Sequence, residues 1–162
     1  MRANNRLTRG MRNRNPMNIR RSASKWVGKV EQAAAADPQF EQFTSITFGI
    51  RAGLYLLTKY VRDYKLDTLP LVIHRWCPNG DGNNNEVMYL NHLKCKCHLI
   101  DNVQVNTRYF FMMAAGICTV ESLFKLTWDI FMGAYALLPQ SMQDFWKKRS
   151  TESQEREEVD GL

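Results

Sequence analysis

The carboxylic acid whose surroundings best suit acid–base chemistry is Glu121. It follows an apolar run on a predicted helix, which includes Phe110, Met113, Ile117 and Val120. Burial beside apolar side chains disfavours the charged form of a carboxyl group and so keeps part of it protonated. Cleavage of a glycosidic bond needs such an acid, often together with a second carboxylate or a group that positions water. The pattern therefore indicates a candidate general acid/base.

An exposed helix face is the alternative interpretation of Glu121. Glu121, Lys125 and Asp129 lie four residues apart, which is the spacing of a surface ladder of charges. The remaining acids are weaker candidates. Glu41 lies between two phenylalanines of a predicted strand, where alternation directs its carboxylate outward. Asp81 lies in a loop of turn-forming residues that can line a cleft.

Cysteine and histidine side chains gather at His92, Cys95, Cys97 and His98, and both are zinc ligands. A Cys-x-Cys pair on one helix directs its sulfurs in diverging directions, and the usual Cys-x-x-Cys spacing is missing. We therefore expect reduced core thiols, with zinc as the alternative. The sequence has no phosphate-binding loop, dinucleotide fingerprint or Ser-His-Asp arrangement, so no cofactor is expected.

Positive charge is concentrated at the N-terminus. Residues 1–30 carry nine arginines and lysines and no acid, so the remainder of the chain is slightly negative within a net charge of +6. Such an arm favours anionic partners, among them nucleic acid bound through residues 2–29, acidic lipid or an anionic cell wall. A solvated tail is the alternative, because the arm lacks aromatic stacking partners and a recognition-helix pattern.

Apolar periodicity predicts a mostly helical chain. Ile50, Leu54, Leu57 and Val61 lie three or four residues apart and predict a helix over residues 46–64. The strongly apolar, uncharged stretch at 109–120 has twelve residues, whereas a membrane span needs about 20. We therefore expect a buried helix and no membrane span. The further helices are expected over residues 69–76, 86–98, 109–124 and 127–138.

Side chains that accept hydrogen bonds precede three of these helices and are expected to cap them: Thr68, Asn106 or Thr107, and Thr127. Near the N-terminus, Trp26, Val27 and Val30 with Gly28 between them predict short strands or a hairpin. The fold class is therefore α+β and mostly helical, with a small β-hairpin region near the N-terminus.

The length of 162 residues fits one domain with one hydrophobic core. We expect a flexible basic arm over residues 1–8, a single domain over 9–146 and a charged tail over 147–162. Six apolar residues fall on the inner faces of their segments and are expected to be largely buried: Trp26, Phe43, Leu54, Leu57, Trp76 and Ile117.

Residues 9–22 read Arg-Gly-Met-Arg-Asn-Arg-Asn-Pro-Met-Asn-Ile-Arg-Arg-Ser, and Lys-Trp-Val-Gly follows at 25–28. This order resembles a recurring phage and prophage family of lysozyme-like, peptidoglycan-degrading or structural virion proteins. The resemblance continues in four further blocks, at 37–43, 48–52, 73–78 and 115–138. One departure is that Asn83-Asn84-Asn85-Glu86 replaces the family's Glu-Asn-x-Thr ahead of a tyrosine.

Glu121-Ser122-Leu123-Phe124 resembles the Glu-Ser-x-Phe motif of lytic transglycosylases, whose glutamate is the general acid/base. In those enzymes one acid can suffice, because a hydroxyl of the sugar completes the cleavage, although their glutamate-bearing helix precedes the other blocks. The Asn-Pro-x-Asn-Ile segment with its tryptophan is also similar to the substrate cleft of bacterial cell-wall glucosaminidases. The resemblance implies a saccharide cleft lined by Asn15, Asn18, Trp26 and Arg75.

Two functions follow as expectations. The first is a virion-associated peptidoglycan glycosidase, a muramidase or lytic transglycosylase, with a lysozyme-like fold and with Glu121 as general acid/base. The second is an inactive virion structural protein of the same fold that docks on other virion proteins through its basic N-terminal arm. The Glu-Ser-x-Phe match favours the first function. The second is favoured because the Asn83-Asn84-Asn85-Glu86 segment after Pro78 departs from the family's Glu-Asn-x-Thr pattern, so an acid that the family has there is displaced or lost. Either protein would be made in the cytoplasm of a bacterial host and located in the virion.

Overall fold

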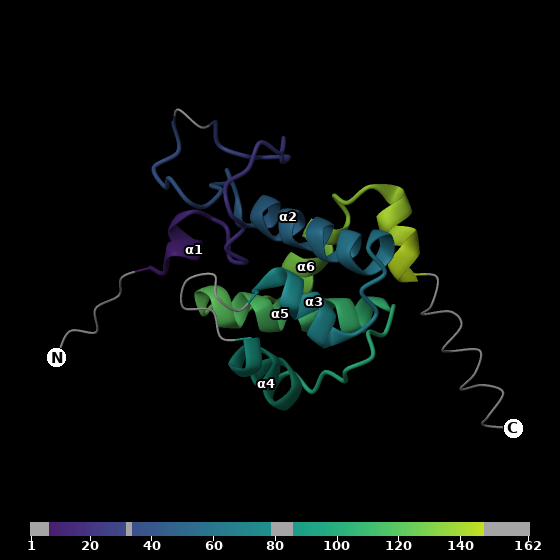
Figure 1. The fold of residues 1–162 in the computed structure, drawn as a ribbon. Helices are drawn as coiled ribbons and strands as arrows, with labels where there is room; N and C mark the ends of the chain where they lie inside the picture. Colours follow the sequence, from purple (N-terminus) through teal and green to yellow (C-terminus); the bar gives the residue numbers. More distant parts are fainter. Residues whose placement is uncertain (1–6, 32–33, 79–85, 148–162) are drawn as a thin grey trace, which may run out of the picture.

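The computed structural model describes residues 7–31, 34–78 and 86–147, and it is mostly helical (Figure 1). The helices are α1 (Arg9–Arg12), α2 (Ile46–Thr58), the π-helical turn η2 (Lys59–Asp63), α3 (Leu69–Trp76), α4 (Glu86–Lys96), α5 (Thr107–Ser122), α6 (Trp128–Tyr135) and a further helix over residues 140–147.

The arm expected over residues 1–8 and the tail expected over 147–162 lie almost entirely outside the described residues. Thr8, the last residue of that arm, caps α1 by accepting a hydrogen bond from the backbone N–H of Met11. The hydroxyl of Thr8 also donates to the carbonyl oxygen of Ser122 at 3.0 Å. This hydrogen bond ties the start of α1 to the end of α5.

Hydrogen-bonding side chains begin α3, α5 and α6, as their positions in the sequence predicted. Thr68 caps α3, Asn106 caps α5 and Thr127 caps α6, and each accepts a hydrogen bond from the backbone N–H three residues later. At its other end, α5 stops at Leu123, which adopts the left-handed conformation with φ 53°. Glu121 therefore lies in the last turn of α5, next to a sharp change of chain direction.

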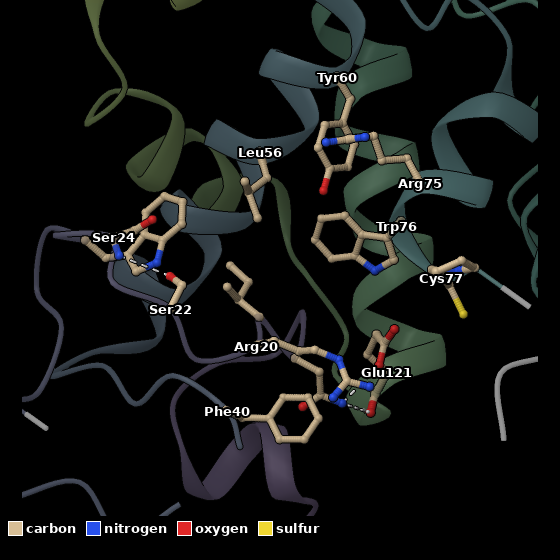
Figure 2. Close-up of a pocket in the computed structure, with 14 residues that line it drawn as sticks. Arg20, Ser22, Ser24, Phe40, Leu56, Tyr60, Arg75, Trp76, Cys77 and Glu121 are labelled. Atoms are coloured by element: carbon tan, nitrogen blue, oxygen red, sulfur yellow. Dashed lines mark hydrogen bonds between the residues drawn. The ribbon is translucent and has the colours of Figure 1, made fainter. Parts of the chain in front are cut away.

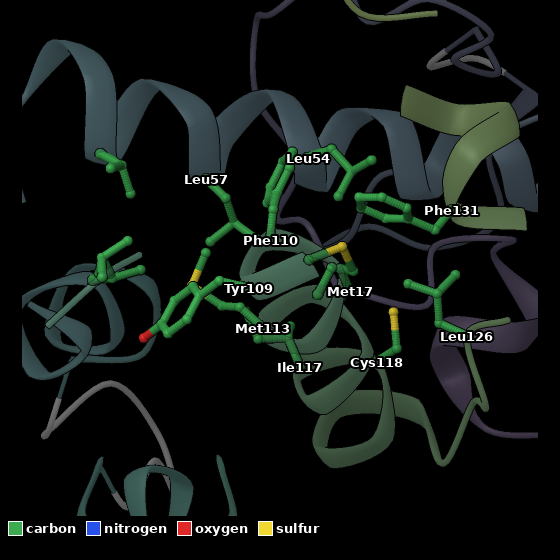
Figure 3. Packing of buried hydrophobic residues seen from close by; sticks show 14 of the residues in the cluster. Met17, Leu54, Leu57, Tyr109, Phe110, Met113, Ile117, Cys118, Leu126 and Phe131 are labelled. Carbon is green, nitrogen blue, oxygen red and sulfur yellow. The ribbon is translucent and has the colours of Figure 1, made fainter. Parts of the chain in front are cut away.

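The core is organised around α5. Figure 1 shows α2 and α4 on opposite sides of α5, and Figure 3 shows Leu54 and Leu57 of α2 pointing toward Phe110 and Met113 of α5. The ring of Phe110 also stacks on that of Trp146, with 4.0 Å between centroids. Burial of these large apolar side chains is the main stabilising contribution to such a fold.

Burial follows the sequence prediction at four of the six positions. Phe43, Leu54, Leu57 and Ile117 are almost fully buried, which confirms the prediction for them. Trp26 and Trp76 are partly buried and pack against the core, so the prediction holds only in part for these two residues. Both tryptophans line a pocket. Apolar periodicity identifies a large side chain that turns inward, but it does not distinguish a core from a pocket wall.

The N-terminal region pairs differently from the expected hairpin. In place of a hairpin centred on Gly28, two isolated antiparallel bridges join Arg20 with Phe40 and Lys29 with Phe43. The chain makes a turn at Gly28, which has a φ of 72°, and then pairs with a segment further along the sequence. Residues 19–30 and 39–44 thus hold each other through separate hydrogen bonds and form no continuous ladder.

The position of Glu41 differs from the one expected from the sequence. It was expected to face solvent, yet it is 2% exposed and its Oε1 accepts hydrogen bonds from the backbone N–H of Ser22 at 3.0 Å and from Lys29 Nζ at 2.9 Å. The segment that carries Glu41 pairs with residues 19–30 through its backbone, which brings these donors around the carboxylate. A buried carboxylate is stable there because a cation and an N–H donor compensate for its lost hydration.

Gly49 allows the N-terminal loop to pack directly on α2. An added Cβ at this position would overlap the carbonyl oxygen of Arg14 and approach the Cα of Asn15 to 3.1 Å. Both neighbours are backbone atoms and cannot rotate away. Gly49→Ala should therefore lower the free energy of unfolding by about 1–3 kcal/mol, as measured by chemical denaturation.

Gly133 of α6 is the matched control for Gly49. An added Cβ there meets nothing within 4 Å among the described residues. Gly133→Ala should raise the free energy of unfolding by up to about 1 kcal/mol, because alanine has the higher helix propensity. Equal effects of the two substitutions would contradict the close packing at Gly49.

Among the described residues, the structure has no helix that is both long and apolar enough to cross a membrane.

Candidate functional site

A pocket of about 460 Å³ opens between the N-terminal loops and the helices (Figure 2). The N-terminal loops form one wall, the ends of α2 and α3 with η2 form another, and α5 contributes Glu121. Four of the five site residues expected from the sequence lie in its lining. The lining residues are Asn18, Ile19, Arg20, Ser22, Ser24, Trp26, Phe40, Leu56, Tyr60, Arg75, Trp76, Cys77, Pro78 and Glu121.

Two hydrogen bonds orient the carboxylate of Glu121. Its Oε2 accepts from Asn18 Nδ2 at 3.0 Å, and its Oε1 accepts from the hydroxyl of Tyr89 at 3.2 Å. Asn18 Nδ2 also donates to the backbone oxygen of Glu121 at 3.0 Å, which links the loop to the helix end. A carboxylate oxygen can accept more than one hydrogen bond, so both oxygens keep acceptor capacity for a ligand in the pocket.

Asn15 lies behind the pocket wall, although it was expected to line the cleft. Its side chain is fully buried and donates to the carbonyl oxygens of Ile19 at 2.9 Å and Glu41 at 3.0 Å, while its Oδ1 accepts from the N–H of Ile19 at 3.0 Å. These bonds close the turn that presents Asn18, whose φ of 50° is left-handed, a conformation that asparagine tolerates. Asn15 therefore positions the neighbouring site residue.

Tyr89 is a site residue that the sequence reasoning missed. It lies on α4, it is 5% exposed and its hydroxyl contacts Glu121. Burial raises the pKa of Tyr89 well above its usual value, and the nearby Glu121 raises it further. Tyr89 thus stays protonated and acts as a hydrogen-bond donor. The sequence did contain a signal for Tyr89, because the pattern of the resembling family places a tyrosine after the Asn-rich loop.

Aromatic rings form much of the pocket wall. Trp26 packs edge-on against Tyr55 with centroids 5.8 Å apart, and Trp76 packs edge-on against Tyr60 at 6.4 Å. The Nε1 of Trp26 is buried and has no hydrogen-bond partner within the part of the chain that the structure describes. Aromatic faces combined with polar groups suit ligands with an apolar face and a polar edge, as sugar rings have.

The pocket carries charge of both signs. Arg75 and Arg20 contribute guanidinium groups, and Glu121 is the single carboxylate among the described lining residues. Figure 2 shows Arg20 pointing toward Glu121, with its guanidinium 5.5 Å from the ring centre of Phe40. The weaker candidate Asp81 lies outside the described residues. The described part of the pocket thus has one acid available for proton transfer.

Several arginines of the basic segment are held by contacts inside the domain. Arg12 donates to the carbonyl oxygen of Leu7 at 2.6 Å, and Arg14 donates to that of Thr44 at 2.7 Å. Arg9 lies 3.6 Å from the carboxylate of Asp37. Part of the positive charge therefore stabilises the N-terminal loops.

No group of three or more His, Cys, Asp and Glu side chains is arranged to hold a metal ion in residues 7–31, 34–78 and 86–147. All four cysteines are free thiols. Burial raises the pKa of the Cys97 and Cys118 thiols, so both favour the protonated form.

Comparison with known proteins relates the chain to a bacteriophage protein. No protein-family model matches the chain. Protein P5 of Pseudoalteromonas phage PM2 is 31% identical over 121 residues, which cover 73% of this chain and 73% of that protein.

Proposed function

The chain belongs to a family of bacteriophage proteins that includes Protein P5 of Pseudoalteromonas phage PM2, and we propose that it is a virion-associated peptidoglycan glycosidase. The proposed fold is lysozyme-like, and the proposed activity is that of a muramidase or a lytic transglycosylase. Synthesis in the host cytoplasm and packaging with other virion proteins are part of this proposal.

One observation carries the proposal. The carboxylate of Glu121 lies in the wall of an aromatic-lined pocket and is oriented by hydrogen bonds from Asn18 and Tyr89. A fixed carboxyl group beside a bound sugar can donate its proton to the glycosidic oxygen as the bond to the anomeric carbon breaks. Trp26 and Arg75 would hold the saccharide, by stacking and by hydrogen bonding respectively.

Among the described lining residues Glu121 is the single carboxylate, which favours the transglycosylase form of the reaction. After protonating the leaving oxygen, ionised Glu121 can take the proton from a hydroxyl of the same sugar while that oxygen bonds to the anomeric carbon. Glu121 is then protonated again, and no second carboxylate is needed. Hydrolysis follows the same sequence when water supplies the attacking oxygen.

The direct test is a zymogram in which the purified protein is renatured in a gel that contains peptidoglycan. A clear zone at the position of the protein is expected. Mass spectrometry of the released fragments then separates the two reactions, because a hydrolysed end is one water heavier than an end closed by the sugar's own hydroxyl. No clearing by a correctly folded protein at any pH would contradict the proposal.

An inactive virion structural protein is the second candidate. The observation that favours it is exposed apolar surface beside the basic helix α1: Leu7 is 60% exposed and Leu123 is 81% exposed. The contact between Thr8 and Ser122 brings their two segments together. Such a surface suits docking on another virion protein, and the basic segment at 2–29 suits nucleic acid. This candidate predicts co-purification with virions and no clear zone.

A further inference from the structure

Arg75 is held in place by two tyrosines of the π-helical turn that follows α2. Its guanidinium carbon lies 5.3 Å from the ring centre of Tyr60 and 4.6 Å from that of Tyr64. The two rings stack with 6.0 Å between centroids and 24° between planes. Tyr60 lies inside η2 and Tyr64 directly follows it, so the π-helical turn brings the two rings together. Turns of this type are frequent at functional sites.

This arrangement leaves the guanidinium equipped to bind an anion. The rings of Tyr60 and Tyr64 pack against the guanidinium, whereas the N–H donors of such a planar group lie along its edge. Arg75 is exposed to solvent and lines the pocket. A guanidinium that is already oriented loses less conformational entropy when it binds a carboxylate.

Arg75 and Glu121 lie at different ends of the pocket. Figure 2 shows Arg75 with Tyr60 at one end, Glu121 at the other, and the ring of Trp76 between them. A saccharide whose glycosidic oxygen lies at Glu121 would pass Trp76 and bring its next substituent toward Arg75. An anionic substituent at that position would meet an oriented cation.

We propose that Arg75 forms a carboxylate-binding subsite, so that the pocket selects saccharides with a free carboxylate over neutral amino-sugar polymers. This inference rests on the proposed function and specifies its substrate. In peptidoglycan, a muramic acid unit that bears no peptide carries such a carboxylate on its lactyl group. The planar guanidinium can bind the carboxylate through two parallel hydrogen bonds, a geometry that the lysine ammonium cannot reproduce.

Binding can be measured separately from cleavage in the Glu121→Gln variant. The probes are the disaccharide of N-acetylglucosamine and N-acetylmuramic acid, and the neutral disaccharide of N-acetylglucosamine. Fluorescence of the pocket residues Trp26 and Trp76 reports occupancy. The carboxylate-bearing probe should bind about 10- to 100-fold more tightly, which is the range for a charge-assisted pair. Adding Arg75→Gln should reduce the preference to about twofold or less, and Arg75→Lys should restore only part of it.

Lys59→Gln is the matched control for Arg75→Gln. The Lys59 ammonium lies 5.8 Å from the ring centre of Tyr64, yet Lys59 is not among the residues that line the pocket. Its removal changes the net charge equally and should leave the preference intact. Equal binding of both probes by the Glu121→Gln protein, no binding of either probe, or a preference that survives Arg75→Gln would overturn the inference.

The outcomes for Arg75 and for the proposed function can be told apart. If the protein prefers the carboxylate probe but gives no clear zone in the zymogram, the carboxylate-binding subsite is supported and the glycosidase function is contradicted. If the protein clears peptidoglycan but binds both probes equally, the glycosidase function is supported and the carboxylate-binding subsite is contradicted.

Discussion

Glu121→Gln should lower the rate of peptidoglycan cleavage by about 10³-fold or more, because the glutamine amide is not acidic enough to protonate the leaving oxygen. The amide matches the carboxyl group in shape, and its oxygen can still accept the hydrogen bond from Asn18 or from Tyr89. The fold and the affinity for saccharide should therefore change little. The rate can be followed as the loss of turbidity of a peptidoglycan suspension, with near-ultraviolet circular dichroism to check tertiary packing.

Asp129→Asn is the control for this substitution. Asp129 lies in the first turn of α6, it is exposed to solvent and it does not line the pocket. The same loss of one negative charge at that position should leave the cleavage rate within about twofold, since surface substitutions have small effects. Full activity of the Glu121→Gln variant would show that another group donates the proton. If neither the unmodified protein nor the Asp129→Asn variant cleaved peptidoglycan, the results would favour the inactive virion structural protein.

The positions of the helices could be predicted from local chemistry, but the residues at which they end could be predicted less accurately. The caps at Thr68, Asn106 and Thr127 depend on hydrogen bonds within one turn, so sequence spacing suffices to identify them. The helix expected over residues 46–64 is divided into α2 and the π-helical turn η2, a change in backbone hydrogen bonding that apolar spacing does not reveal. The helix α5 was expected to reach Phe124, yet the left-handed Leu123 ends it earlier.

The pocket lining could be predicted in part, because the resemblance pointed to Glu121, Asn18, Trp26 and Arg75, and these four residues line the pocket. These side chains come together through contacts between segments about a hundred residues apart in the chain, such as the hydrogen bond from Asn18 to Glu121. Periodicity carries no information about such contacts. The burial of Glu41 escaped prediction for the same reason, since its partner Lys29 comes from a different loop.

Tyr89→Phe should lower the turnover number by about 100-fold, because Glu121 would lose one of the two donors that orient its carboxylate. The ring fills the same space in both residues, so the buried packing around α4 should be kept. Turnover can be measured on the same peptidoglycan suspension.

Tyr109→Phe provides the comparison that isolates the catalytic effect. The hydroxyl of Tyr109 is also part-buried and donates to the carbonyl oxygen of Ile100 at 2.8 Å, away from the pocket lining. Burial raises the pKa of Tyr109 as it does that of Tyr89, so each substitution removes one protonated donor. Both should lower stability by about 1–2 kcal/mol, but only Tyr89→Phe should change turnover. Parallel losses of activity in the two variants would mean that Tyr89 stabilises the fold and does not orient Glu121.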